Sequence, residues 1–147
     1  MSSYWNAHPN FVHNPAAPLQ QEFNRLADQN GWDPDKAQYK REWKRCGQEE
    51  FAHHFGRDEN RLAGWQAMCA TVGVKEVPES IKQCKQVLRT TWINIFDLLD
   101  AKRTGRPVKK HASAKALREY TKREDKIFPK KDAKKNRFLK AWLIKMF

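Results

Sequence analysis

The sequence predicts an all-α protein, an irregular bundle of about six helices around a long central helix, with an extended N-terminal segment. Apolar residues recur three and four positions apart in several stretches, which is the spacing of one helix face. No alternating apolar–polar runs are joined by a hairpin turn, and no strand–helix–strand alternation occurs. Six Trp, eight Phe and three Tyr in 147 residues suffice for a buried core, although 31% of the residues are charged.

The domain organisation follows from the prolines and the charge. Residues 1–17 contain prolines without apolar periodicity, which predicts an extended segment. Trp5 and Phe11 within this segment favour packing across the rest of the protein. Residues 18–147 are expected to form a single helical domain, in which residues 101–147 are the basic C-terminal third.

Two helices are predicted in the first half of the chain. The first opens at Pro18, a residue suited to the first turn, and ends at Gly31. The second opens at Asp33, an N-cap residue followed by proline, and ends at Gly56. Gly47 interrupts its apolar stripe and makes this the expected place for a kink or a break.

A third helix is predicted from Asn60 to Val72, and the long central helix follows it. Ser80 with Gln83 is a capping-box pattern and starts this fourth helix, which is expected to continue to about Arg103. Its WINIFDLL stretch is apolar nearly all round, which is typical of a buried helix. At 1.5 Å per residue the helix would span about 35 Å.

The last two helices follow a break at Gly105. Ser113 is a suitable N-cap for the fifth helix, whose apolar side carries Leu117 and Tyr120. Pro129 permits a sixth helix to start beyond it. Its expected apolar face is made of Phe138, Leu139, Trp142, Leu143 and Met146.

The charge is distributed unevenly along the chain. Of the formal net charge of +12, residues 101–147 carry seventeen Lys/Arg against four Asp/Glu, whereas residues 1–74 carry eight against nine. Such a concentration of one sign attracts polyanions and accelerates their association. The sequence therefore predicts a non-catalytic module that binds nucleic acid, DNA or RNA, without sequence specificity.

The phosphate contacts are expected from three groups of cations: a loop, the fifth helix and the sixth helix. On the fifth helix they recur at spacings of three and four, opposite the apolar side. Their expected role is to position the protein on phosphates and not to read bases. The predicted contacts are Lys102, Arg103, Arg106, Lys109, Lys110, Lys115, Arg118, Lys122, Lys134, Arg137 and Lys140.

The location expected for such a protein is inside the cell, in the nucleus more than in the cytoplasm. The basic run from Lys102 to Lys110 resembles a nuclear import signal. The start of the chain lacks the basic and apolar regions of a secretory signal, and no apolar run is long enough for a membrane span.

Three other interpretations of the basic third remain open. It could be a solvated surface that supports helix formation and solubility. It could steer an acidic protein partner toward an apolar helical groove involving Trp5, Trp32 or Trp142, as in an interaction adaptor. It could also adhere to an anionic membrane surface through the C-terminal AWLIKMF.

No catalytic, metal or cofactor site is expected. The three cysteines are predicted to be reduced and buried, and no close pair of ligands beyond adjacent His53 and His54 indicates zinc. Nucleotide-binding and kinase motifs are missing. Asn94 and Asp97 within the apolar fourth helix are expected to be hydrogen-bonded structural residues. The third and fourth helices resemble a helix-turn-helix only loosely, because their connection is too long.

Several segments together resemble an uncharacterised family of small basic filamentous-fungal proteins with no assigned activity. They are FVHNPAAP at 11–18, EFNRLADQNGW at 22–32, LAGWQAMC at 62–69, SIKQCK at 80–85, NIFDLLD at 94–100, LREYTK at 117–122 and KIFPKKDAKK at 126–135. Since they cover most of the chain, the resemblance implies one continuous domain. It implies no activity and no site residues.

Overall fold

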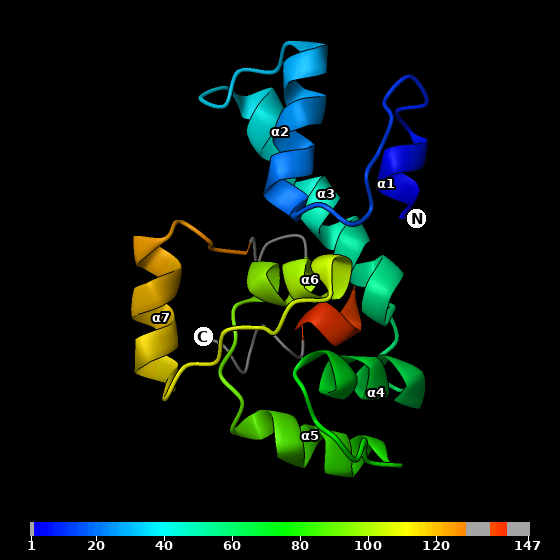
Figure 1. The fold of residues 1–147 in the computed structure, drawn as a ribbon, viewed down its shortest axis with the longest axis vertical. Coiled ribbons are helices and arrows are strands. Elements are labelled where there is room, and N and C mark those ends of the chain that lie inside the picture. Colours follow the sequence, from blue (N-terminus) through cyan, green and yellow to red (C-terminus); the bar gives the residue numbers. More distant parts are fainter. Residues whose placement is uncertain (1, 129–135, 141–147) are drawn as a thin grey trace.

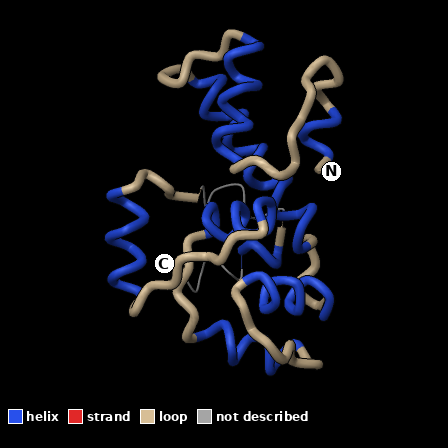
Figure 2. Tube along the Cα trace, in the orientation of Figure 1, coloured by secondary structure: helices blue, strands red, loops and turns tan. Residues whose placement is uncertain are grey.

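The computed structural model describes residues 2–128 and 136–140, and every regular element in these ranges is a helix (Figure 2). The helices are α1 (Ser3–Asn6), α2 (Leu19–Asn30), α3 (Ala37–Phe55), α4 (Leu62–Thr71), α5 (Ile81–Arg89), α6 (Ile95–Thr104) and α7 (Ala114–Arg123). Residues 137–140 form one further helical turn. The predicted all-α fold class is confirmed.

The helix that organises the fold is α3, which has 19 residues and a length of about 28 Å. It packs against α1, α2, α4 and α6. In Figure 1, α2 lies beside its upper end, α6 lies near the centre, α4 and α5 lie below, and α7 stands at the left side. The helix does not break at Gly47, because α3 continues through it.

The single helix predicted over residues 80–103 is wrong. The chain forms α5 and α6, with residues 90–94 outside both helices. Asn94 caps α6: its side-chain oxygen accepts hydrogen bonds of 2.9 and 3.2 Å from two backbone N–H groups of the first turn. Trp92 pairs instead with His111, whose N–H donates to the Trp92 carbonyl at 2.8 Å. An Asn side chain that caps a helix start favours a non-helical conformation at its own position, so the chain leaves α5 before Asn94 and begins α6 after it.

The two serine caps predicted from the sequence are confirmed. The Ser80 hydroxyl accepts a hydrogen bond from the N–H of Gln83 at 3.2 Å, and the Ser113 hydroxyl accepts one from the N–H of Ala116 at 3.1 Å. The predicted start of the second helix at Asp33 is wrong, because that residue begins a turn and α3 starts at Ala37.

The N-terminal segment is more ordered than an extended chain. It contains α1, and the side chains of Tyr4, Trp5 and Phe11 are buried. Trp5 is only 2% exposed and lies within the continuous hydrophobic cluster of the protein. It therefore does not form part of an exposed docking patch.

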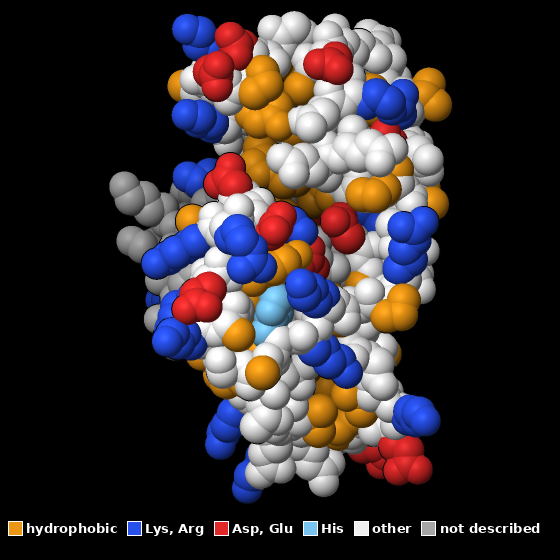
Figure 3. Space-filling view, turned by 60° about the vertical axis from the view of Figure 1, so that its left-hand side comes forward, with side chains coloured by type: hydrophobic (Ala, Val, Ile, Leu, Met, Phe, Trp, Pro, Cys, Tyr) orange, Lys and Arg blue, Asp and Glu red, His pale blue; other side chains and the backbone are white. Residues whose placement is uncertain are grey.

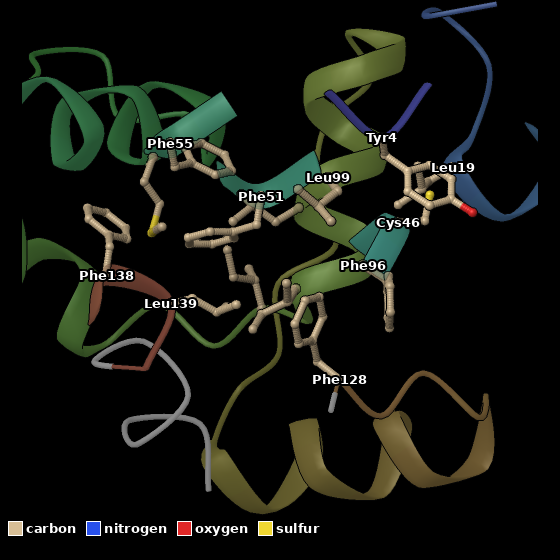
Figure 4. Close-up of a cluster of buried hydrophobic side chains, with 14 of the residues drawn as sticks. Tyr4, Leu19, Cys46, Phe51, Phe55, Phe96, Leu99, Phe128, Phe138 and Leu139 are labelled. Carbon is tan, nitrogen blue, oxygen red and sulfur yellow. The ribbon is translucent and has the colours of Figure 1, made fainter. Parts of the chain in front are cut away.

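The centre of the protein is a layer of aromatic and aliphatic side chains between α3 and α6 (Figure 4). Phe51 of α3 packs against Phe55 of the same helix and against Phe138 from the helical turn near the C-terminal end. Phe96 of α6 packs against Phe128 with ring centroids 5.0 Å apart. All three cysteines are free and buried, as predicted.

Candidate nucleic-acid interface

The helix α7 separates apolar and basic side chains onto opposite sides. Leu117 and Tyr120 are buried, whereas Lys115, Arg118 and Lys122 are exposed. The three cations are three and four positions apart, so they form one row along the outer side of the helix. The sequence predicted this arrangement correctly.

A closed set of hydrogen bonds fixes α7 against α6. The Tyr120 hydroxyl donates to one Asp97 oxygen at 2.7 Å, and the Lys126 ammonium donates to the other at 2.8 Å and to the Tyr120 hydroxyl at 2.9 Å. The Asn94 amide donates to the Thr121 hydroxyl at 3.1 Å. Asn94 and Asp97 are thus hydrogen-bonded structural residues, as predicted.

Lys126 differs from the other cations of this region because it is held in that cluster. Burial acts to lower its pKa, but the hydrogen bonds to Asp97 and Tyr120 outweigh burial and raise the pKa of Lys126. The helical spacing groups Lys126 with the row on α7, yet its charge is already balanced by Asp97. It therefore supports the row without being part of it.

The loop between α6 and α7 lies beside the same helix. The Lys109 ammonium is 4.7 Å from the centre of the Tyr120 ring, and the centres of the His111 and Tyr120 rings are 4.5 Å apart. We call six exposed cations of this loop and of α7 the basic face; Arg123, which is also exposed on α7, is left out because its guanidinium lies 3.5 Å from a carboxylate oxygen of Glu124. The members of the basic face are Arg106, Lys109, Lys110, Lys115, Arg118 and Lys122.

Figure 3 looks toward the α7 side of the molecule, where lysine and arginine side chains gather. Lys102 is exposed on α6, shortly before this loop. Residues 101–128 contain ten Lys/Arg and three Asp/Glu, so the cations outnumber the acids on this part of the chain. Among the described residues, no acid forms an ion pair with a member of the basic face.

Arg103 does not belong to this surface, and its predicted contact with phosphate is corrected. Its side chain is 2% exposed, and its guanidinium lies 2.9 Å from a carboxylate oxygen of Glu50. It also donates hydrogen bonds to the carbonyls of Ala17 at 2.6 Å and Asn14 at 2.9 Å. The Arg103 guanidinium has its partners inside the protein, and through them it links α6 to α3 and to the N-terminal segment.

The predicted contacts beyond residue 128 are not joined to the basic face. Arg137 and Lys140 are exposed, but Phe138 between them packs on Trp65 and fixes the turn near α4. Figure 1 shows this turn (red) apart from α7. Lys134 lies outside the described residues, as do the predicted sixth-helix residues from Trp142 onward and the AWLIKMF segment.

Glu50 forms a buried polar cluster that the sequence analysis missed. One carboxylate oxygen accepts a hydrogen bond of 2.7 Å from the Trp5 indole, and the other lies 2.9 Å from the His54 ring. Burial acts to raise the pKa of Glu50, but these two hydrogen bonds and the charge of Arg103 lower it to about 2. The available signal was the position of Glu50, one turn after Cys46 and one turn before His54 on the same helix.

The buried cluster predicts loss of stability in acid. His13 accepts a hydrogen bond from Arg103 at 2.9 Å, so its ring is neutral in the folded protein. Burial and then the charge of Arg103 lower the pKa of His13 from 6.5 to about 4, against the opposing carboxylates of Glu22 and Glu50. Between these pH values the unfolded chain binds more protons than the folded one. The free energy of unfolding should therefore decrease as the pH falls from about 6.5 to about 4.

Urea unfolding at several pH values tests this prediction. The loss assigned to His13 is on the order of 1–2 kcal/mol, allowing for solvent screening at a half-buried ring. Glu50, whose pKa is lowered from 4.5 to about 2, adds a further loss only below about pH 4.5. His13→Gln should flatten the upper part of the profile, and His8→Gln in the same segment should not. An unchanged profile in His13→Gln would contradict the assignment.

A cleft of about 390 Å³ opens at the α3–α4 connection, but its charges are balanced. Arg57 lies 2.8 Å from Glu49, and Arg61 lies 3.8 Å from Asp58. This cleft therefore lacks the excess of positive charge that characterises the basic face.

The described residues contain no set of three His, Cys, Asp or Glu side chains placed to hold a metal ion. None of the described helices combines the length and the apolar character that crossing a membrane requires. Trp32, suggested above for a docking patch, is partly buried, and its ring contacts those of His8 and Phe23.

Comparison with family models, curated proteins and solved structures gives no match. The resemblance to the fungal family stays a prediction.

Proposed function

We propose that the protein is a non-catalytic module that binds nucleic acid through phosphate contacts from the basic face. The observation that carries the proposal is the row of Lys115, Arg118 and Lys122 on the outer side of α7, beside the cationic loop. Cations that have no carboxylate partner release condensed counterions when they meet a phosphate backbone, which supplies free energy of binding. Such contacts fix position without reading bases, so the binding is independent of sequence.

A nuclear location is part of this proposal. Lys102, Arg106, Lys109 and Lys110 are exposed on one short stretch, which supports recognition of that stretch as an import signal. Arg103 is excluded from the signal because it is buried.

Fluorescence anisotropy of labelled single- and double-stranded DNA and RNA, over a salt series, tests the proposal. We expect log affinity to fall linearly with log salt concentration, with a slope of several units. The triple variant Lys115→Glu, Arg118→Glu, Lys122→Glu should bind about 30-fold more weakly and show a smaller slope. The ranking of the four probes would then identify the preferred nucleic acid.

The matched control reverses three charges on another helix. Lys82, Lys85 and Arg89 of α5 are exposed and have the same spacing of three and four. Because both triple variants change the net charge equally, a loss confined to the α7 variant assigns binding to the basic face. Equal losses would contradict that assignment. No binding to any probe at low salt would refute nucleic-acid binding and would favour an acidic protein partner.

A further inference from the structure

Ser113 carries the helix cap of α7 and also occupies a distinctive place in the sequence. It is the one Ser or Thr in the chain with basic residues at both the third and the fourth preceding positions, namely Lys110 and Lys109. Basophilic serine/threonine kinases select hydroxyls in this setting, because acidic groups in their clefts pair with the upstream cations. The sequence pattern therefore marks Ser113 as a phosphate acceptor.

The structure makes this hydroxyl accessible. Ser113, Lys109 and Lys110 are all exposed, and residues 105–110 have no regular secondary structure. The backbone of the segment is held by the pairing of His111 with Trp92, and the Ser113 hydroxyl accepts the cap bond from the α7 backbone. Side chains add the contacts of Lys109 and His111 with the Tyr120 ring and the packing of Val108 against the core. Opening them lets the segment enter a kinase cleft in extended form.

We infer that a basophilic protein kinase phosphorylates Ser113 and that the added phosphate weakens the binding of nucleic acid to the basic face. The second half of this inference rests on the proposed function. In the transfer, the Ser113 oxygen forms a bond to the γ-phosphorus of a nucleoside triphosphate. The bond between that phosphorus and the oxygen that bridges it to the β-phosphorus breaks. The nucleoside diphosphate leaves, and the hydroxyl proton passes to the catalytic base of the kinase.

The expected consequence follows from the surroundings of Ser113. A phosphoserine carries about −1.5 to −2 charges at pH 7. Here it would lie close in sequence to Lys109, Lys110 and Lys115, so it competes with nucleic-acid phosphates for the same cations. Negative charge at the start of α7 is compatible with the helix, because the first-turn N–H groups and the helix dipole favour it. The phosphate thus changes the charge of the surface while the helix remains.

Ser80 is a natural comparison within the same chain. It caps α5 through the same type of hydrogen bond that Ser113 makes in α7. However, the fourth residue before Ser80 is Glu76 and the third is Val77, so an acid and an apolar residue stand where Ser113 has two lysines. Ser80 should therefore not be modified, although it is also a helix cap.

Incubating the purified full chain with a basophilic kinase and ATP, followed by mass mapping, tests the first half. We expect one phosphoryl group, located on Ser113. Ser113→Asn should abolish incorporation of the phosphoryl group while keeping a good cap residue, and Ser80→Asn should leave the incorporation unchanged. Modification of other residues in preference to Ser113, or none at all, would overturn the inference.

Anisotropy with the probe that binds best tests the second half. Phosphorylated protein should bind at least about tenfold more weakly than unmodified protein at moderate salt, with a salt slope smaller by about one to two units. Unchanged affinity of the phosphorylated protein would overturn the proposed switch. If neither form binds any probe, the proposed function fails, whereas the mass mapping still decides whether Ser113 is an acceptor.

Discussion

Replacing Arg103 with methionine should lower the free energy of unfolding by about 3–5 kcal/mol. The substitution leaves the Glu50 carboxylate buried without its counter-ion, and burying an unpaired charge is costly. It also removes the donors that satisfy the carbonyls of Ala17 and Asn14. Chemical denaturation monitored by circular dichroism measures the change.

Two further variants separate the charge effect from the loss of the side chain. Lys102→Met removes the adjacent cation, which is exposed, and should change the stability by no more than about 0.5 kcal/mol. The double variant Glu50→Met, Arg103→Met should be more stable than Arg103→Met alone, because no buried charge is left unpaired. A loss below about 1 kcal/mol in Arg103→Met would show that the ion pair does not hold the fold together.

A single added methyl group should also be severely destabilising at Gly64. A Cβ atom there would lie 2.3 Å from the backbone carbonyl oxygen of Phe55 and 3.1 Å from the Phe138 ring. Because a backbone carbonyl at the end of α3 cannot move independently, α4 must shift away from α3. We expect Gly64→Ala to lower the free energy of unfolding by about 3 kcal/mol, the upper part of the usual range for overpacking.

Gly47→Ala is the matched control, since Gly47 is also a buried helical glycine. A Cβ there would lie 3.2 Å from the rings of Phe96 and Phe128, which are side chains that can adjust. The gain in helix propensity of about 1 kcal/mol from Gly to Ala should offset much of that crowding. We therefore expect a change within about 1 kcal/mol in thermal and urea unfolding. Similar losses at both glycines would contradict the proposed clash with the backbone of α3.

Local signals in the sequence were sufficient for most helix ends. Ser80 and Ser113 cap their helices as predicted, and Gly31, with φ of 70°, ends α2 in the left-handed conformation. The break at residues 90–94 was not predicted, because an apolar run looks alike in a buried helix and in a buried non-helical segment. Asn94 was the overlooked signal: it is the third residue of the run, and its side chain caps the start of a new helix.

The basic face could be predicted only in part. The row on α7 follows from its spacing, which depends on neighbours along one helix. The inward orientation of Arg103 depends instead on Glu50, which lies on another helix far away in the sequence. A run of charges does not indicate which cation has a buried partner, and so Arg103 was grouped with its exposed neighbours.

The buried ion pair also imposes an order on folding during synthesis. Glu50 leaves the ribosome long before Arg103, and until then its carboxylate has the neighbouring His54 but lacks the guanidinium that pairs with it in the core. We therefore expect the first three helices to pack fully only after α6 has been made, because Arg103 of α6 pairs with Glu50 and binds the carbonyls of Ala17 and Asn14 in the N-terminal segment. A nascent chain that stalls before α6 would remain incompletely folded, with Trp5 and Phe11 accessible to chaperones.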